Sequence, residues 1–503
     1  MSTSRELKRL KTYIPGFELI SNGGLPAGRT TLVSGGPGSA KTILAGQFLA
    51  EGIRHADEPG CFVTFEEKPD DIRRNLSSLG WDIAAWEAAG KWIFVDGSLN
   101  PKDEPLTIGD YDLGGLMARV DHAVGRIGAR RVSLDSIGAM LVQFGRPAVI
   151  RRELYRVAWQ LREMDVTSII TAEHTGHNEA PVEEYVTDNV IILRNTLEDE
   201  KRRRTMEILK FRGASHLKGE FPFTISEESG IILLPLSSIE LRQKSSDKRI
   251  TSGISELDAM CGGGFYRDSV VLVSGATGTG KTLTATEFLA ALEHDERALL
   301  FAFEESRDQL YRNALGWGVD FPKLEASGRL RIVCEYPEVA APEDHLLRIK
   351  KHVEEFKPTR VAVDSLSALE RISTLRTFRE FVLALTSYLK DKQIAGLFTS
   401  TTPSLLGGST VTEAHISSVT DSIILLRYVE VFGEMRRGIA VLKMRGSQHD
   451  RNIREYQIDS HGMHVGEPFR GISGILSGQF THSTSSELQT LQSLFERDDS
   501  EGD

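Results

Sequence analysis

A chain of 503 residues exceeds what one hydrophobic core usually organises, which excludes a small single-domain protein and predicts at least two domains. With 40% hydrophobic and 26% charged residues, the composition excludes a disordered chain. The net charge of −11 disfavours binding to nucleic acid. The N-terminus is polar and basic, unlike a signal peptide, and the chain has no apolar run of about 18 residues that could span a membrane. We therefore expect a cytoplasmic protein that binds neither a membrane nor nucleic acid.

Short apolar runs rich in strand-forming residues alternate with helical patterns along the first half of the chain. A helix is expected at residues 151–164, where Leu154, Val157, Ala158 and Leu161 recur at helical spacing. Because strand and helix alternate, we expect an α/β fold: a mostly parallel sheet with helices on both faces and ligands at the carboxyl ends of its strands. The expected strands lie at residues 30–35, 61–65, 91–97, 130–136 and 167–174.

Residues 34–42, SGGPGSAKT, follow the first of these strands and have the pattern of a phosphate-binding loop. Glycines let backbone N–H groups converge on a phosphate, the next helix adds its dipole, the lysine reaches the phosphate charge and the threonine holds Mg²⁺. Ala40 replaces the second glycine of the pattern, so we expect ordinary helical angles there, since only a positive φ would require glycine. The expected nucleotide contacts are Gly35, Gly36, Gly38, Ser39, Ala40, Lys41 and Thr42.

Carboxylates follow the next strands. Glu66 and Glu67 close the strand in FVTFEEKP, where one could orient or deprotonate an attacking water while its neighbour points to the opposite face. Asp135 ends the run RRVSLDS and, together with Thr42, is the expected magnesium site. The alternatives are a solvated helix start for the glutamates and a helix cap for the aspartate.

The second half of the chain repeats these features at nearly constant offsets. Lys41 and Lys281 are 240 residues apart, the glutamate pairs 238, and Asp135 and Asp364 are 229 apart. A period of about 235 residues is the size of a whole domain, so we interpret the repeat as a duplication. The expected domains are residues 1–246 and 247–465, followed by a C-terminal tail at 466–503.

The second copy contains the stretch SGATGTGKT, residues 274–282, between an expected strand and an expected helix. That setting is typical of a GxxxxGKT phosphate site. Glu304 and Glu305 are the expected catalytic carboxylates, and Asp364 is the expected partner of Thr282 at Mg²⁺. The expected nucleotide contacts are Gly275, Thr277, Gly278, Thr279, Gly280, Lys281 and Thr282.

Two further matching stretches, EILKFRGASH and AVLKMRGSQHD, each carry a lysine and an arginine two residues apart. On a strand, both cations of a stretch would project from one face. Such cations can complete a neighbouring subunit's site and neutralise charge on a transferred phosphoryl group, which would require an oligomer. The alternative is a surface of solvated cations. The candidate residues for such contacts in trans are Lys210, Arg212, His216, Lys443, Arg445 and Ser447.

The copies differ just before a shared Val-Thr-Asp. A hydroxyl near a γ-phosphate and an activating carboxylate can replace water as the acceptor, which converts hydrolysis into autophosphorylation. Serine and threonine are also ordinary loop and capping residues. The first copy has Glu179, Glu184 and Tyr185 where the second has Thr412, Ser417 and Ser418.

These stretches resemble the KaiC family, the RecA-like double-domain ATPases and autokinases of the bacterial circadian clock, over about residues 7–470. The stretches that carry the resemblance most specifically are RNTLEDEKRRRTMEILKFRGASHLKGE, AHISSVTDSIILL and GEMRRGIAVLKMRGSQHD. The resemblance implies two tandem RecA-like P-loop domains that assemble into a homohexamer of two stacked rings, with ATP bound at subunit interfaces. It implies slow hydrolysis in the N-terminal ring and phosphoryl transfer in the C-terminal ring.

The resemblance also assigns individual residues. Ser417 and Ser418 fall at the family's adjacent phosphoacceptor positions, and Thr412 falls at the neighbouring threonine. Arg371 and Arg379 fall where the family has arginines near the acceptors and the nucleotide. The acceptor pair here is Ser-Ser where the family's clock protein has Ser-Thr.

Two other function classes stay open at this point: a RecA-type DNA-dependent ATPase or helicase, and a signalling scaffold assembled by ATP. The chain has no basic stretch interleaved with aromatic residues, which disfavours the first class. The acidic tail could dock a partner protein, as the family's tail does, or could be a frayed, soluble end. The resemblance also implies a KaiB-like or other regulatory protein as a partner. Cys61, Cys261 and Cys334 have no metal-binding spacing, so we expect three reduced thiols.

Overall fold

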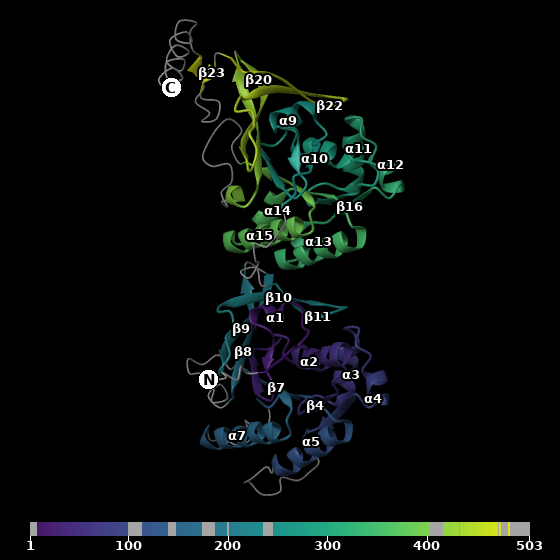
Figure 1. The fold of residues 1–503 in the computed structure, drawn as a ribbon, viewed down its shortest axis with the longest axis vertical. Helices are drawn as coiled ribbons and strands as arrows, with labels where there is room; N and C mark the ends of the chain where they lie inside the picture. Colours follow the sequence, from purple (N-terminus) through teal and green to yellow (C-terminus); the bar gives the residue numbers. More distant parts are fainter. Residues whose placement is uncertain are drawn as a thin grey trace, which may run out of the picture. The chain divides into compact units, whose positions relative to one another are not determined.

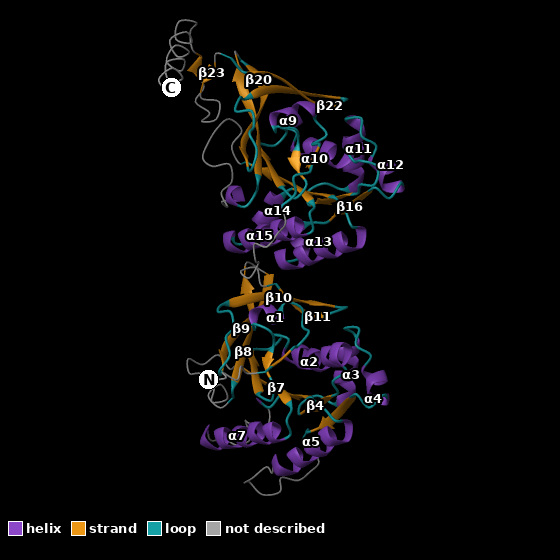
Figure 2. Ribbon diagram, viewed as in Figure 1, coloured by secondary structure: helices purple, strands orange, loops and turns teal. Residues whose placement is uncertain are grey.

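The chain forms two compact units, residues 1–238 and 239–503, each built around a nine-stranded sheet. Both sheets are mostly parallel and carry helices on their faces (Figures 1 and 2), which confirms the expected pair of α/β domains. The units divide slightly ahead of the boundary expected near residue 247. The computed structural model describes residues 8–98, 113–138, 147–173, 187–198, 201–234, 245–402, 416–431, 433–470, 472–473 and 481–482.

The sheet of the first unit has the strand order β11-β10-β9-β8-β3-β7-β6-β4-β5. Strands β8, β3, β7, β6, β4 and β5 are parallel, whereas β9, β10 and β11 continue the sheet as antiparallel strands. All the strands expected in this half are present. The bounds are β3 (Thr30–Gly35), β4 (Gly60–Thr64), β5 (Trp92–Asp96), β6 (Arg131–Asp135), β7 (Thr167–Glu173), β8 (Asn189–Glu198), β9 (Lys201–Phe211), β10 (Glu220–Ser226) and β11 (Gly230–Leu233), with a separate pair, β1 (Arg9–Leu10) and β2 (Leu25–Pro26).

Both faces of this sheet are buried. Successive residues of a strand point to opposite sides, so each strand contributes side chains to two clusters. Val33 of β3 packs in the cluster that contains α2, whereas its neighbour Leu32 packs with α5 and α7. In α7, Leu154, Val157 and Leu161 are buried as predicted. The helices are α1 (Phe17–Ile20), α2 (Lys41–Ala56), α3 (Pro69–Ser77), α4 (Ile83–Ala88), α5 (Leu113–Ile127) and α7 (Pro147–Glu163).

The sheet of the second unit repeats this arrangement in the order β16-β15-β17-β18-β14-β19-β20-β21-β22. Its strand β14 lies between β18 and β19 and is parallel to both. The strands are β14 (Val270–Gly275), β15 (Ala298–Ala302), β16 (Leu330–Cys334), β17 (Arg360–Asp364), β18 (Ala395–Thr401), β19 (Ser422–Val431), β20 (Glu434–Met444), β21 (Arg454–Asp459) and β22 (Gly462–Pro468), with the short pairs β12 (Arg249–Ile250) and β13 (Phe265–Tyr266), and β23 (Ile472–Ser473) and β24 (Thr481–His482).

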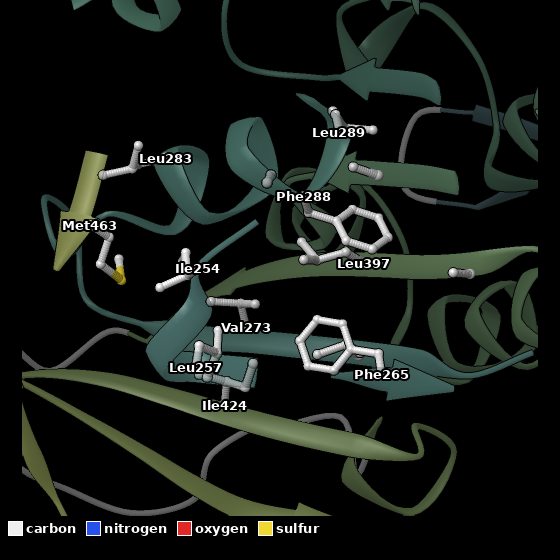
Figure 3. Close-up of a cluster of buried hydrophobic side chains, with 14 of the residues drawn as sticks. Ile254, Leu257, Phe265, Val273, Leu283, Phe288, Leu289, Leu397, Ile424 and Met463 are labelled. Carbon is white, nitrogen blue, oxygen red and sulfur yellow. The ribbon is translucent and has the colours of Figure 1, made fainter. Parts of the chain in front are cut away.

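One hydrophobic cluster of the second unit joins β14 to the helix that follows it. Val273 of β14 lies near Leu257 and Ile424, and Phe288 lies beside Leu397 (Figure 3). This packing fixes the strand and the helix on either side of the phosphate loop. The helices are α9 (Ser255–Met260), α10 (Lys281–Ala290), α11 (Arg307–Gly316), α12 (Phe321–Ala326), α13 (Pro342–Phe356), α14 (Leu366–Arg371) and α15 (Leu375–Asp391), with 3₁₀ turns η3 (Pro337–Val339) and η4 (Ile416–Ser418).

The cysteines fit the expected structural role. Cys61 and Cys261 are buried, and burial raises the pKa of each thiol to about 12. Within the described ranges, no cluster of His, Cys, Asp and Glu has the makings of a metal site. None of the helices described here is both long and apolar enough to cross a bilayer.

A buried arginine opens the strand that leads to each expected magnesium aspartate. Arg360 is 1% exposed, and its guanidinium donates to the carbonyl of Phe288 in α10 at 3.1 Å and to the carbonyl of Thr251 at 2.7 Å. The same guanidinium pairs with Glu296 at 3.1 Å. In the first unit, Arg131 donates to the carbonyl of Phe48 in α2 at 2.9 Å in the same way. Each arginine therefore ties β6 or β17 to the helix that begins at the phosphate loop.

Replacing Arg360 by Met should lower the free energy of unfolding of the second unit by about 3–5 kcal/mol, because the change leaves Glu296 and two carbonyls without their donor. Urea unfolding, followed by hydrogen exchange of peptides from each unit, measures this loss. The matched control is Arg376→Ala, which removes a pair with Glu380 whose arginine is 81% exposed and should cost less than about 1 kcal/mol. Equal losses in the two variants would contradict the role given to Arg360.

Candidate nucleotide site

The second phosphate loop leaves β14 at Gly275 and enters α10 at Lys281. Gly278 and Gly280 have φ angles of 80° and 93°, a left-handed conformation that favours glycine. Lys281 is buried, and its Nζ donates to the carbonyl of Ala276 at 2.9 Å. The loop therefore presents backbone N–H groups, a helix N-terminus and an ammonium group to one place, which is the chemistry that binds phosphate.

The expected magnesium residues lie together at this loop. Asp364 ends β17 and accepts hydrogen bonds from the hydroxyls of Thr282 and Thr399. Burial raises the pKa of Asp364, while these hydrogen bonds and the charge of Lys281 lower it. In the first unit, Asp135 accepts hydrogen bonds from Thr42 and Thr171 in the same way. A carboxylate and a hydroxyl within hydrogen-bond reach form the oxygen donor set that suits Mg²⁺.

The glutamate pairs lie just past their strands, so the expectation that they close the strands is wrong by two residues. β4 ends at Thr64 and β15 ends at Ala302. Phe303, the residue after Ala302, is still hydrogen-bonded to the end of the neighbouring strand β17, since its N–H donates to the carbonyl of Asp364 at 2.8 Å. This contact places Glu304 and Glu305 at the edge of the sheet where Asp364, the expected magnesium aspartate, also lies.

The two members of each pair have different partners. Glu304 accepts from Ser365 Oγ at 2.9 Å and pairs with Arg371 at 2.7 Å, whereas Glu305 accepts from Asn313 Nδ2 at 3.0 Å. Burial, followed by the charge of Asp364, raises the pKa of Glu305. Burial lowers the pKa of Lys281, and the charges of Asp364 and Glu304 oppose this shift only in part.

The first copy repeats this divergence at its own glutamate pair. Glu66 accepts from Ser136 Oγ at 3.1 Å, and Glu67 accepts from Asn75 Nδ2 at 3.3 Å. Burial, followed by the charge of Asp135, raises the pKa of Glu67. In both copies, one carboxylate therefore turns toward the strand that carries the magnesium aspartate and the other turns toward the following helix.

In the second unit, the candidate trans-acting cations donate hydrogen bonds to backbone carbonyls of the segment that precedes β19. Lys443 Nζ donates to the carbonyl of Thr420 at 2.5 Å, and Arg445 Nη2 donates to the carbonyl of Ser418 at 2.8 Å. Since β20 ends at Met444, Arg445 lies just beyond the strand, which corrects the expectation that both cations lie on it. Burial, followed by the charge of Arg445, lowers the pKa of Lys443.

The first copy repeats the lysine contact, and its arginine lies near an aspartate as Arg445 lies near Asp421. Lys210 Nζ donates to the carbonyl of Thr187 at 2.8 Å, and Arg212 lies 3.9 Å from Asp188. Arg212 likewise lies beyond its strand, because β9 ends at Phe211.

These cations lie at the far end of the central strand from the phosphate loop of their own chain. Asp421 accepts from the N–H of Val270, the first residue of β14, at 2.9 Å, and Arg445 lies 3.9 Å from Asp421. The phosphate loop begins at Gly275, at the other end of β14. Five residue steps along a strand span about 16 Å. The cations and the turn at Ile416–Ser418 are therefore separated from their own loop by about that distance.

A polar hollow of about 400 Å³ opens at this end of the second unit. Lys390, Asp421 and Arg445 line it together with Tyr266 and Asp268. Lys390 and Asp421 form an ion pair at 2.7 Å. This end of the sheet thus offers charged groups to a ligand or chain from outside the unit.

A family model described as "ATPase: KaiC" matches residues 10–238 and 250–469. The chain belongs to the KaiC family. "Circadian clock protein KaiC3" from Synechocystis sp. is 59% identical to it over 97% of this chain and 98% of that protein. "Circadian clock oscillator protein KaiC" is 50% identical in Thermostichus vulcanus and 48% identical in Synechococcus elongatus, over 97% and 98% of this chain and 95% and 96% of those proteins. The two copies are thus two KaiC ATPase domains, and membership implies the use of ATP.

The remaining predicted residues of this KaiC chain are distributed as follows. His216 Nε2 bonds to the carbonyl of Ile208 at 2.9 Å, within the same stretch of chain. Ser447 Oγ accepts from Arg249 at 2.7 Å and so links two segments that are far apart in the sequence. Ser418 is exposed, as is Arg379. The predictions at Glu179, Glu184, Tyr185 and Thr412, and at the side chain of Ser417, lie outside the described residues.

Three pairs of KaiC residues that contact the carboxylates were missed from the sequence. The internal repeat could have identified them, because the two members of each pair are separated by nearly the same number of residues as the two carboxylates that they contact. The serines are 229 residues apart, the asparagines 238 and the threonines 228. The pairs are Ser136 and Ser365, Asn75 and Asn313, and Thr171 and Thr399.

The expectation for Ala40 is wrong. Its φ is 75°, so it occupies the left-handed region, as Gly280 does in the second KaiC domain with φ 93°. The reason is that the loop enters its helix through a left-handed residue in both copies. The first copy therefore holds an alanine in a conformation that costs an L-residue about 1–2 kcal/mol.

Ala40→Gly should raise the free energy of unfolding of the first unit by about 0.5–1 kcal/mol, because relief of strain exceeds the added chain entropy. The mirror change, Gly280→Ala, should lower that of the second unit by about 1–3 kcal/mol, since a Cβ there would lie 2.8 Å from Ile458 Cδ1. Urea unfolding with unit-specific peptides tests both. Destabilisation by Ala40→Gly would show that the alanine is not strained.

Proposed function

We propose that this KaiC-family protein hydrolyses ATP in its first domain and, in its second, transfers the γ-phosphoryl group to Ser417 and Ser418, as a timing or signalling regulator. One observation carries the proposal: the acceptor turn and the cations Lys443 and Arg445 lie about 16 Å along β14 from the chain's own phosphate loop. A site that needs both ends of the sheet is completed only by a second chain.

A head-to-tail contact between identical chains meets this need. In such a contact, the phosphate loop of one chain faces the cations and the acceptor turn of the next, and a closing rotation produces a ring. Six chains in two stacked layers are what the resemblance to KaiC proteins implies. The hollow beside Arg445 and Asp421 supports this end as the receiving surface.

The chain's own residues suit Mg²⁺ and ATP at the loop. Thr282 and Asp364 would hold Mg²⁺, which when bound neutralises charge on the β- and γ-phosphates. Lys281 would bind the phosphates, and the loop N–H groups would orient them. In the first domain, Lys41, Thr42 and Asp135 have the same roles.

The glutamates next to these residues would accept the proton of the attacking hydroxyl group or water. In the second domain, the serine Oγ bonds to the γ-phosphorus, the bond from that phosphorus to the leaving ADP oxygen breaks, and the hydroxyl proton passes to Glu304 or Glu305. In the first domain, water takes the place of the serine and Glu66 or Glu67 accepts its proton. Lys443 and Arg445, or Lys210 and Arg212, would stabilise the charge on the transferred group from the neighbouring chain.

The relatives' names support a role in a clock, and for this chain we propose partners of that kind: a KaiB-like or other regulatory protein. The net charge of −11 works against the DNA-dependent alternative. A scaffold held together by ATP makes the same assembly but forms no phosphoserine, so covalent label separates it from the proposed kinase.

Mixing two inactive variants tests the transfer between chains. Lys281→Ala keeps both serines but should lose labelling alone by at least about 100-fold, because the phosphate loses its buried cation. The double variant Ser417→Ala and Ser418→Ala keeps the loop but has no acceptors. When the two are allowed to exchange subunits with ATP, we expect phosphopeptide mass spectrometry to find label on the Lys281→Ala chain.

Two outcomes of this experiment would overturn parts of the proposal. Label on the wild-type chain but none in the mixture would mean that transfer occurs within one chain. No label on the wild type over a day would favour the scaffold. Lys41→Ala is the matched control: it should lower ATP hydrolysis while the serines are still labelled.

A further inference from the structure

The hairpin of β21 and β22 contacts the second phosphate loop at three successive places. The Tyr456 hydroxyl donates to the carbonyl of Thr279 in the loop. A Cβ built on Gly280 would lie 2.8 Å from Ile458 of β21. Further along α10, the N–H of Met463 in β22 donates to Glu287 Oε1 at 3.0 Å. The hairpin thus supports the loop and the helix that carries Lys281.

The first unit has the same support with one different side chain. Gln47 of α2 stands where α10 has Glu287, since each lies six residues after its loop lysine. Gln47 Oε1 accepts from the N–H of Ile231 at 2.7 Å, as Glu287 Oε1 does from Met463. The amide nitrogen of Gln47 also donates to the carbonyls of Ser229 and Ile231, at 2.8 and 3.0 Å. The hairpin turn therefore offers carbonyls to a donor on the helix.

In the second unit, the atom corresponding to that amide nitrogen is Glu287 Oε2. It is sealed from solvent and has no hydrogen-bond partner among the described residues. An ionised Oε2 cannot donate, and an unpaired buried charge is costly. A proton on Oε2 removes the charge and restores the donor that glutamine supplies in the first unit.

The turn packs directly on this carboxyl group. A Cβ on Gly462, whose φ is 111°, would lie 2.0 Å from Glu287 Oε1. The charged groups that act on Glu287 are His464 of β22, which lowers its pKa, and Glu256 of α9, which raises it. His464 also pairs with Asp459 of β21 at 3.1 Å. Burial outweighs these charges and raises the pKa of Glu287 from 4.5 to about 7.

We infer that Glu287 is a positioning residue of the second nucleotide site: as a neutral acid it donates from Oε2 to the β21–β22 turn and holds this hairpin on the phosphate-loop helix. Ionisation removes the donor and loosens the hairpin. Because folding raises the pKa, this stabilisation is complete below the unfolded pKa of 4.5 and is lost as the pH rises through about 7. The second site would therefore be pH-sensitive where the first, with glutamine, is not.

Hydrogen exchange of the full-length protein tests this inference without any phosphorylation assay, so its outcome is separate from that of the proposed kinase. From pH 5.5 to 7.5, protection of peptides from residues 454–468 should fall roughly tenfold after correction for the intrinsic exchange rate. Peptides from residues 220–233 of the first unit should not change. Constant protection of the 454–468 hairpin in the wild type would overturn the inference.

Two reciprocal variants distinguish this role from a merely structural one. Glu287→Gln should keep the hairpin protected and make its protection independent of pH. Gln47→Glu should give the first unit's hairpin the roughly tenfold fall that the second shows in the wild type. If Glu287→Gln fails to fold, Gln47→Glu still decides: a first hairpin that stays independent of pH with glutamate at position 47 contradicts the mechanism.

Discussion

The parallel alignment of β14 with β18 and β19 is the constraint on which the rest of the site depends. Because all three strands run the same way, the end of β14 carries the phosphate loop while the turn at Ile416–Ser418 lies before the start of β19, at the opposite edge. Hydrogen bonding fixes this register, and packing on both faces resists a slip, since a shift of one residue would move every side chain to the opposite face. The separation of about 16 Å thus belongs to the backbone and cannot be closed by side-chain motion.

The same alignment explains why each domain gathers its carboxylates at one place. Parallel strands end at one edge, so Asp364, the turn after β15 and the start of α10 meet there without any long-range loop. The buried Arg360 acts at the other end of β17 and holds that strand against α10. One strand therefore carries a structural cation at its beginning and the carboxylate proposed for Mg²⁺ at its end, and the first domain repeats this with Arg131 and Asp135.

Much of this could be read from the sequence because it depends on local patterns. Strand and helix alternation, the glycine loops and the constant offsets identified both domains, their central strands and the carboxylates. The errors have a different origin. The angles at Ala40 and the partners of Glu304 depend on the way the loop is closed by neighbouring strands, which no single stretch records. The paired serines, asparagines and threonines were recoverable, but only by comparing the halves residue by residue.

Two differences between the copies lie where the hairpin meets the loop helix, and they illustrate how a duplicated site can diverge. The β-sheet is the same in both copies, and so is the aspartate with its two threonine partners. The supports differ: Phe223 in the first copy corresponds to Tyr456, whose hydroxyl reaches the loop, and Gln47 corresponds to Glu287. The tyrosine adds a polar contact to the second loop, whereas Glu287 keeps one of the three hydrogen bonds that Gln47 makes to its hairpin. Divergence through the support can alter how firmly the loop helix is held while the residues at the phosphate loop remain the same.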